Sequence, residues 1–321
     1  MIVFLTTRAH DYTHSKLQGN GRVEIERVDY GRFLTRRRIV NATYVFTDLD
    51  RLNFWELELA GRIYRQLGKA GIRVLNDPAR VRQRFSLLRA LRAAGLNRFD
   101  TWRVEDVGRP RSDEYPVFLR TASAHRGNLT DLLQTPAELD AAIATALGDG
   151  IPQSELLIIQ YCAEPVRPGL FRKLSVYRVG DRMLTTLCVH DTRWTAKYGE
   201  QGIAGAELYD EELRFVRDNV WGEALRAAFD VACIEYGRAD FALVDGKPQV
   251  YEINTNPNYG PVIEHPFPQR IEAGRRVEQA LLDALVAVDN PLGGCAVRIG
   301  GWPLEQQRSR DRWFLAPRWT P

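Results

Sequence analysis

Two alternating strands joined by a tight turn, over residues 236–254, constrain this chain more than any other feature. The tripeptide Asp-Gly-Lys at 245–247 is a hairpin turn signal, and polar and apolar residues alternate on both sides of it. Asp240 lies six residues before Gly246, and Glu252 lies six residues after it. Because side chains alternate faces along a strand, this spacing predicts two carboxylates that oppose each other across the hairpin, with Cβ atoms about 4.5–5.5 Å apart.

A pair of opposed carboxylates indicates a cation site. Two carboxylates at that distance repel each other unless a proton or a cation lies between them. Asn254 adds an amide oxygen to the same face, and this set of hard oxygen ligands suits Mg²⁺ with phosphate oxygens and water completing its shell. A solvated strand face is the alternative, but it accounts poorly for the polar run at 255–258. We therefore interpret Asp240, Glu252 and Asn254 as metal ligands, and we expect Glu252→Gln to leave the fold intact.

The composition is that of an ordinary globular protein and excludes several classes. Of 321 residues, 45% are hydrophobic and 26% are charged, which is enough to bury a large core. A net charge of +3 does not indicate nucleic acid or a membrane surface as a partner. No run of 18 apolar residues exists, and the apolar start of the chain reads as a strand and not as a signal peptide. Four cysteines without CxxC spacing fit a reducing, cytoplasmic location, and the oligomeric state stays open, a homo-oligomer included.

The order of the predicted elements places the hairpin in an α/β chain of three lobes and a tail. Residues 1–75 alternate short strands with a helix and read as a Rossmann-like α/β lobe with a parallel sheet. Residues 76–155 form a central lobe of helices and strands. Residues 156–290 form a C-terminal lobe that carries the acidic hairpin. Residues 291–321 are rich in Arg and Trp, and we expect them to be irregular.

The hairpin resembles the signature of the ATP-grasp superfamily, which includes glutathione synthetase, D-alanine–D-alanine ligase and the glutamate-adding ribosomal-protein ligases. That signature is Arg-x-Asp on one strand and Glu-x-Asn on the next. Here Arg238 precedes Asp240, and Asn254 follows Glu252, at those spacings. The resemblance covers about residues 76–260. It implies that the two carboxylates and Asn254 hold magnesium, and that Arg238 is a catalytic residue that contacts the transferred phosphate.

The resemblance also implies where ATP binds. Two family lysines that reach the phosphates are replaced here by Arg84, on the helix after Asn-Asp-Pro at 76–78, and by Arg120, at the end of an apolar strand. Arginine keeps the charge but changes the geometry of the contact. Residues 123–128 loosely match the small-residue loop over the phosphates, and 158–162 resemble the hinge strand that contacts adenine. The implied ATP-binding residues are Arg84, Arg120, Gln160, Tyr161, Cys162, Glu164 and Lys173.

A second substrate and a flexible lid lie, in the family, near the place that residues 188–197 occupy here. His190, Arg193 and Lys197 are candidate contacts to an anionic substrate, and Asn256 is a further candidate. A solvated loop with one packed tryptophan explains this segment equally well. The other histidines considered show no metal spacing with one another and read as surface residues: His10, His14 and His125.

The resemblance thus implies an ATP-grasp fold behind a Rossmann-like lobe, with ATP and Mg²⁺ between the central and C-terminal lobes. The implied activity is that of an ATP-dependent carboxylate–amine ligase. It would phosphorylate a small-molecule or peptide carboxylate and join the acyl-phosphate to an amine. Two alternatives stay open, because a fold does not fix a function: a phosphotransferase on the same fold, and a non-catalytic nucleotide-binding module.

Overall fold

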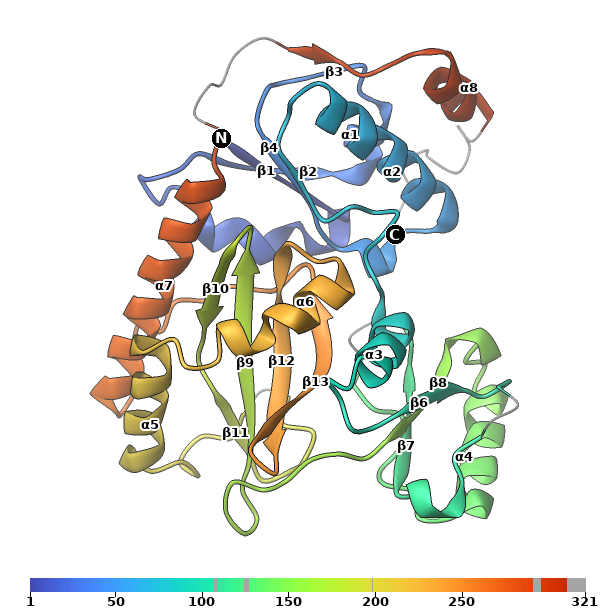
Figure 1. Ribbon diagram of the computed structural model, residues 1–321, viewed down its shortest axis with the longest axis vertical. Coiled ribbons are helices and arrows are strands. Elements are labelled where there is room, and N and C mark those ends of the chain that lie inside the picture. The colour runs from blue at the N-terminus through green and yellow to red at the C-terminus, as the bar shows by residue number, and fades with distance from the viewer. Residues whose placement is uncertain (107–108, 124–126, 198, 291–295, 311–321) are drawn as a thin grey trace.

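The computed structural model (Figure 1) describes residues 1–106, 109–123, 127–197, 199–290 and 296–310. The strands are β1 Ile2–Thr6, β2 Ile25–Asp29, β3 Arg38–Ile39, β4 Thr43–Phe46, β5 Val74–Leu75, β6 Thr101–Arg103, β7 Val117–Thr121, β8 Leu156–Gln160, β9 Phe171–Val179, β10 Arg182–Thr185, β11 Val189–Asp191, β12 Tyr236–Val244, β13 Lys247–Asn254 and β14 Val297–Arg298. The α-helices are α1 Tyr30–Thr35, α2 Phe54–Lys69, α3 Arg84–Ala93, α4 Pro136–Gly148, α5 Ala206–Arg217, α6 Arg226–Ala232, α7 Pro268–Val288 and α8 Trp302–Arg310. The short 3-10 helices are η1 Arg8–Leu17, η2 Leu49–Arg51, η3 Ser112–Glu114, η4 Gln153–Glu155 and η5 Glu223–Leu225. None of the described helices combines the length and the apolar character needed to span a membrane.

The N-terminal lobe is built on a parallel sheet of order β2-β1-β4-β5, which confirms the predicted α/β lobe. Strand β1 is buried on both faces, as its unbroken apolar run requires. Val3 and Leu5 face the core under α1 and α2. Ile2 and Phe4 face the opposite core, which α7 and the C-terminal sheet share. This sheet is therefore joined to the C-terminal lobe through its second face.

The chain returns to the N-terminal lobe after α7, where an irregular tail was expected. Strand β14 pairs antiparallel with β3, and α8 packs against α2. Ile299 and Leu304 are buried in the core beneath α1 and α2. The prediction of an irregular tail is therefore wrong for the described residues 296–310. The segment has too few apolar residues to show a helical period, and the core of the N-terminal lobe buries the few that it has. The tail residues Trp313 and Trp319 lie outside the described residues.

The central and C-terminal lobes are each built on an antiparallel sheet, and the two sheets lie side by side (Figure 1). The central sheet has the order β6-β8-β7, with α4 packed on one face and α3 on the other. The C-terminal sheet has the order β10-β9-β12-β13, with β11 also paired to β9. Helix α6 covers one face of this sheet and α7 covers the other. The predicted hairpin is confirmed.

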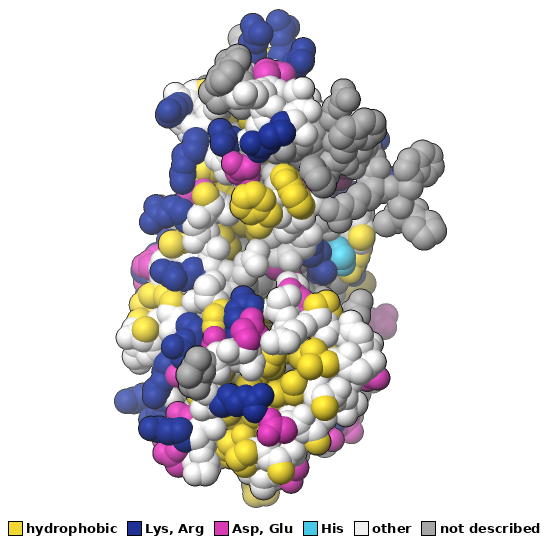
Figure 2. Space-filling model, turned by 90° about the vertical axis from the view of Figure 1, so that its right-hand side faces the viewer, with side chains coloured by type: hydrophobic (Ala, Val, Ile, Leu, Met, Phe, Trp, Pro, Cys, Tyr) yellow, Lys and Arg dark blue, Asp and Glu magenta, His cyan; other side chains and the backbone are white. Residues whose placement is uncertain are grey.

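Arginine is an ordinary surface residue of this chain. Figure 2 shows basic side chains along one edge of the molecule from top to bottom, with acidic side chains among them. Arg37, for example, pairs with Glu305 at 3.1 Å, and the Arg37 side chain is 76% exposed. A functional arginine must therefore be recognised by its burial and its neighbours.

Asn76 joins the N-terminal lobe to the hairpin. Its buried Nδ2 group donates hydrogen bonds to the carbonyl oxygens of Phe46, at 3.0 Å, and Tyr236, at 2.8 Å. Its Oδ1 atom accepts from the backbone N–H groups of Glu235, at 2.8 Å, and Tyr236, at 2.9 Å. These bonds use the full capacity of the amide. The backbone of Asn76 is left-handed, with φ of 64°, a conformation that asparagine tolerates. Asn76 therefore fixes the start of β12 against the end of β4.

We expect Asn76→Ala to lower the free energy of unfolding by at least about 3 kcal/mol, since buried backbone groups lose their partners at roughly 1–3 kcal/mol each. Urea unfolding measures the change. Asn258→Ala is the control, because Asn258 is exposed and should change stability by less than about 0.5 kcal/mol. Equal stability of the two variants would show that Asn76 does not hold the lobes together.

Candidate functional site

The carboxylates of Asp240 and Glu252 oppose each other, as the sequence predicts, but a β-bulge brings them there. The hairpin turn has two residues, 245–246, with φ of 48° and 70°. A ladder continued from that turn without a break would place Tyr251 opposite Asp240. The register instead shifts by one residue between Asp240 and Phe241. Tyr251 therefore has no paired residue on β12, and Glu252 lies opposite Asp240. The short turn is the sequence signal that a bulge is needed.

The bulge also brings Tyr251 into the site. Strict alternation would put Tyr251 on the face opposite Glu252, but both residues line the same pocket. The Tyr251 hydroxyl donates to the carbonyl oxygen of Cys162 at 2.6 Å, and its ring centroid lies 5.9 Å from that of Phe99. Reorienting a side chain is a recurrent effect of β-bulges. Sequence alternation alone therefore missed Tyr251 as a site residue.

Asp240 is held by two basic side chains. It is buried, and its Oδ1 atom lies 2.9 Å from Nε of Arg238 on the same strand. Its Oδ2 atom lies 3.1 Å from Nζ of Lys173 on the neighbouring strand β9. The negative charge of Asp240 raises the pKa of Arg238 above its ordinary value, against the effect of burial. Arg238 therefore stays charged beside Asp240, and the two basic side chains compensate the carboxylate in the ligand-free chain.

Glu252 is held by two arginines from other elements. Its Oε2 atom lies 2.8 Å from Nη2 of Arg84, on α3, and 3.7 Å from Nη2 of Arg120, on β7. Arg84 also donates to the carbonyl oxygens of Thr121, at 3.0 Å, and Ala122, at 2.8 Å. Burial, together with the positive charge of Arg84, lowers the pKa of Arg120 to about 10, and Glu252 opposes that shift. Glu252 therefore stabilises two crowded arginines, which reverses the expectation that its charge is dispensable to the fold.

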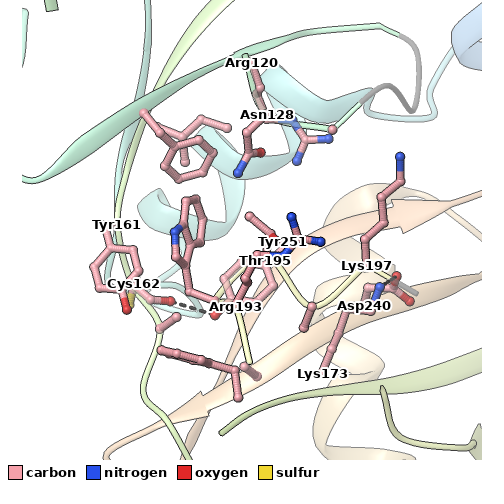
Figure 3. Close-up of a pocket in the computed structure, with 18 of the residues that line it drawn as sticks. Arg120, Asn128, Tyr161, Cys162, Lys173, Arg193, Thr195, Lys197, Asp240 and Tyr251 are labelled. Carbon is pink, nitrogen blue, oxygen red and sulfur yellow. Dashed lines mark hydrogen bonds and ion pairs between the residues drawn. The ribbon is translucent and has the colours of Figure 1, made fainter. Parts of the chain in front are cut away.

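A pocket of about 500 Å³ lies between the central and C-terminal sheets, within the size range of small-ligand sites. Aromatic and aliphatic side chains line one part, including Phe99, Phe118, Ile159, Tyr161, Trp194 and Tyr251. Charged side chains line the other part, including Arg120, Lys173, Lys197, Asp240 and Glu252. Figure 3 shows Tyr161 and Cys162 on one side of the pocket, and Lys173, Lys197 and Asp240 on the other. The pocket is thus divided into an apolar part and a charged part.

Most of the residues expected to contact ATP line this pocket: Arg120, Gln160, Tyr161, Cys162, Glu164 and Lys173. Arg84 is the exception. The helix expected directly after residues 76–78 starts instead at Arg84, and the Asp77 side chain accepts a turn hydrogen bond from Ala79 and pairs with Arg65. Arg84 is consequently buried and lines a smaller cavity of about 40 Å³ together with Asn254.

Two of the pocket residues also have structural partners. Gln160 accepts, through Oε1, from the backbone N–H of Asp100 at 3.1 Å. Glu164 accepts from the backbone N–H of Asp245 at 3.0 Å and so anchors the turn of the acidic hairpin. The loop expected over the phosphates is described only in part, because residues 124–126 lie outside the described residues. Asn128, just after them, lines the pocket.

The four candidate substrate residues separate into two groups. Arg193 and Lys197 line the pocket, whereas His190 and Asn256 do not. His190 is buried, and burial lowers its pKa to about 4, assisted by the positive charges of nearby arginines. The His190 imidazole is therefore a neutral group of the protein interior at neutral pH, and it is not placed to contact a ligand in the pocket.

Asn256 connects the acidic hairpin to the N-terminal lobe. Its Oδ1 atom accepts from the hydroxyl of Thr13 at 2.6 Å, and its backbone N–H donates to Oδ1 of Asn254 at 2.7 Å. The neighbouring His14 was expected at the surface but is fully buried. Its Nε2 atom lies 2.9 Å from the hydroxyl oxygen of Tyr236. Burial lowers the pKa of His14 to about 3, so this histidine is neutral. The polar run after the hairpin thus serves the contact between lobes.

The hairpin offers few oxygen ligands for a metal ion. Among the residues that the structure describes, no group of three or more His, Cys, Asp or Glu side chains could hold a metal ion. Asp240 and Glu252 provide two carboxylates, and Asn254 provides an amide oxygen on the same strand as Glu252. Such a set matches Mg²⁺, which keeps waters and phosphate oxygens in its shell, better than a metal held by protein ligands alone.

No protein-family model matches the sequence, and no curated protein matches it. Solved structures do match. The D-alanine–D-alanine ligase of Bacillus anthracis is 15% identical over 90% of this chain and 97% of its own, with a TM-score of 0.51. The ATP-grasp ligase PsnB, complexed with a minimal precursor, is 18% identical over 89% of this chain and 98% of its own, with a TM-score of 0.53. The D-alanine–D-alanine ligase of Coxiella burnetii is 12% identical over 98% of each chain, with a TM-score of 0.50. This chain therefore has the ATP-grasp fold that these ligases share.

Proposed function

We propose that this chain is an ATP-dependent carboxylate–amine ligase that binds Mg-ATP in the 500 Å³ pocket. The observation that carries the proposal is the opposed pair Asp240 and Glu252, which lies at the charged part of that pocket on an ATP-grasp fold. A hairpin that only closed a sheet would have no need of two carboxylates compensated by four basic side chains.

The pocket fits a nucleoside triphosphate in one orientation. The base lies in the apolar part, beside the segment Tyr161–Cys162, and the phosphates lie in the charged part. Arg120 is the proposed phosphate contact, because it lines the charged part of the pocket and its Nε–H group has no hydrogen-bond partner among the described residues. Lys173 and Lys197 supply further positive charge from β9 and from the segment after β11. The positive charges of these side chains attract a polyphosphate chain.

The donor set of the hairpin fits magnesium. Asp240, Glu252 and Asn254 would hold the ion, with phosphate oxygens completing its shell. Bound there, Mg²⁺ would neutralise charge on the phosphate oxygens of ATP. Arg238, which does not line the pocket itself but whose Nε lies 2.9 Å from the pocket residue Asp240, is proposed to stabilise the negative charge of the transferred phosphoryl group. Arg84 positions Glu252 from outside the pocket, a role that replaces the direct phosphate contact expected from the sequence.

The proposed reaction has two steps. In the first, a carboxylate oxygen of the substrate bonds to the γ-phosphorus of ATP while the bond to the β-phosphate oxygen breaks, and ADP leaves. In the second, an amine attacks the acyl carbon, a carbon–nitrogen bond forms, and inorganic phosphate and a proton leave. The chain contributes by positioning the reactants and by excluding water from the acyl-phosphate. Arg193, at the pocket rim, is the proposed contact for an anionic acceptor.

Amine-dependent release of ADP tests the proposed function. The purified chain is incubated with Mg-ATP and a set of small-molecule and peptide carboxylates, each with and without a set of amines. Release of ADP that requires both reactants supports a ligase. A phosphorylated product formed without an amine would indicate a phosphotransferase, and tight ATP binding without turnover in any pair would indicate a nucleotide-binding module.

We expect Glu252→Gln to abolish turnover and also to lower the stability of the ligand-free chain by about 1–2 kcal/mol. The second effect arises because two crowded arginines lose a charged partner that is partly screened by solvent. Urea unfolding and ADP release measure the two effects. Glu223→Gln is the control, since Glu223 forms an exposed pair with Arg226. Full activity of Glu252→Gln at limiting magnesium would exclude Glu252 as a ligand.

We expect Arg120→Ala to weaken ATP binding at least about ten-fold, because a charge-assisted hydrogen bond contributes roughly 1.5–3 kcal/mol. Arg84→Ala should reduce stability more than ATP affinity, since Arg84 lies outside the pocket lining. Arg37→Ala is the surface control. Calorimetric titration with Mg-ATP ranks the three variants. If Arg84→Ala weakens ATP binding more than Arg120→Ala does, the proposal that Arg120 is the phosphate contact and Arg84 only positions Glu252 is wrong.

A further inference from the structure

A buried ion pair lies outside the pocket and joins two helices of the C-terminal lobe. Glu212, on α5, is fully buried, and its Oε2 atom pairs with Nη1 of Arg270, on α7. The two helices lie side by side, on the far side of the C-terminal sheet from the central lobe (Figure 1). Neither side chain lines the 500 Å³ pocket, so direct contact with a ligand there does not explain the pair.

The ion pair holds both backbone groups of a single residue, Cys188. The backbone N–H of Cys188 donates to Oε2 of Glu212 at 2.6 Å. The carbonyl oxygen of Cys188 accepts from Nη1 of Arg270 at 2.9 Å. Cys188 is buried and immediately precedes β11. Because the peptide planes on both sides of Cys188 are held, the pair fixes the direction in which the chain enters β11.

Strand β11 leads directly into the residues that reach the central lobe. Trp194, the one tryptophan expected to pack in this stretch, has its ring centroid 4.8 Å from that of Phe118 on the central sheet. Arg193 and Lys197 line the pocket together with these two residues. The chain then returns to the C-terminal lobe at α5, on which Glu212 lies. The ion pair therefore joins the two ends of the connection between β11 and α5, and that connection contacts both lobes.

Stability alone does not explain this pair. Replacing a buried ion pair by apolar side chains of similar volume is often neutral or stabilising, because two charges lose their hydration on burial. Here the cost is larger, because Oε1 of Glu212 is buried and accepts no hydrogen bond from the described residues. Burial also raises the pKa of Glu212, against the opposing charge of Arg270. What the ion pair provides, and an apolar pair cannot, is a partner for each backbone group of Cys188.

We propose that Glu212 and Arg270 are positioning residues that hold residues 193–197 in place across the pocket, acting through the backbone of Cys188. Without the pair, residues 193–197 would leave the central lobe more often, as a local opening and not as global unfolding. A ligand that contacts both lobes binds the arrangement with these residues in place, and a smaller population of that arrangement lowers its apparent affinity. The effect on ATP rests on the proposed function, whereas the effect on the chain itself does not.

Limited digestion with trypsin tests the positioning role in the ligand-free chain, since trypsin cleaves after Arg193 and after Lys197. Glu212→Ala should raise the rate of cleavage at these two bonds at least about ten-fold, because cleavage follows the population of the locally open form. Glu212→Gln keeps an oxygen that accepts from the Cys188 N–H group and should restore most of the resistance. Mass spectrometry of the fragments assigns each cleaved bond.

Two controls separate positioning from a general loss of stability. Glu207→Ala, on the same helix, removes an exposed pair with Arg167 and should be cleaved at the rate of the wild type. Leu304→Ala weakens the core of the N-terminal lobe and should not favour the bonds after residues 193 and 197 over other trypsin sites. Unchanged cleavage at these two bonds in Glu212→Ala, or an equal acceleration at every trypsin site, would overturn the proposal.

A double substitution keeps the test decisive if Glu212→Ala does not fold. Glu212→Leu combined with Arg270→Met replaces both charges by apolar side chains of similar size, a change that proteins often tolerate. The double variant still lacks both partners of the Cys188 backbone, so we expect the same selective cleavage after residues 193 and 197. Wild-type resistance of the folded double variant would overturn the proposal.

Addition of Mg-ATP distinguishes failure of this proposal from failure of the proposed function. In Glu212→Ala, saturating Mg-ATP should return cleavage at the two bonds to within about two-fold of the wild-type rate, since a bound ligand favours the arrangement that it contacts. Selective cleavage that Mg-ATP does not suppress would support the positioning role and count against the proposed function. Absence of selective cleavage, with or without Mg-ATP, would overturn the positioning role and leave the proposed function standing.

Discussion

The opposition of two carboxylates across one hairpin is the constraint on which the rest of the site depends. Asp240 and Glu252 cannot lie side by side in a partly buried cleft unless positive charge surrounds them. The chain supplies that charge from four elements, α3, β7, β9 and β12, and these elements belong to both the central and C-terminal lobes. The hairpin is therefore an electrostatic centre as well as a pair of strands. In the ligand-free chain the arginines and the lysine compensate the carboxylates, and in the proposed complex a metal with a polyphosphate would share in that compensation.

Burial of polar side chains between lobes gives this centre a fixed position. Asn76 ties the start of β12 to the end of β4, and Asn256 ties the end of β13 to Thr13 in η1. Both asparagines are buried, so each of these hydrogen bonds is shielded from water and expensive to lose. The acidic hairpin is thus anchored at both ends to the N-terminal lobe, and the pocket forms where the central lobe faces it.

The sequence predicted features that rest on local signals, and it missed those that depend on tertiary contacts. The turn within 245–247 and the alternation around it follow from local chemistry, and the structure confirms them. The opposition of the carboxylates was predicted correctly, although the bulge at Tyr251 that produces it was not considered. The burial of His190 and the helix at 302–310 could not be predicted, because each depends on a surface supplied by a distant part of the chain. Among proposed site residues, Arg84 shows the same effect, since its pairing with Glu252 joins residues far apart in sequence.

The central claim is that the acidic hairpin binds ATP through magnesium. Calorimetric titration of the wild-type chain with ATP, once in excess Mg²⁺ and once in EDTA, tests it most directly. The account predicts saturable binding in Mg²⁺ and a loss of at least about ten-fold in affinity in EDTA, equivalent to roughly 1.4 kcal/mol or more. Equal affinity in the two buffers would contradict a metal role for Asp240 and Glu252, and no binding in either buffer by a folded chain would contradict the account as a whole.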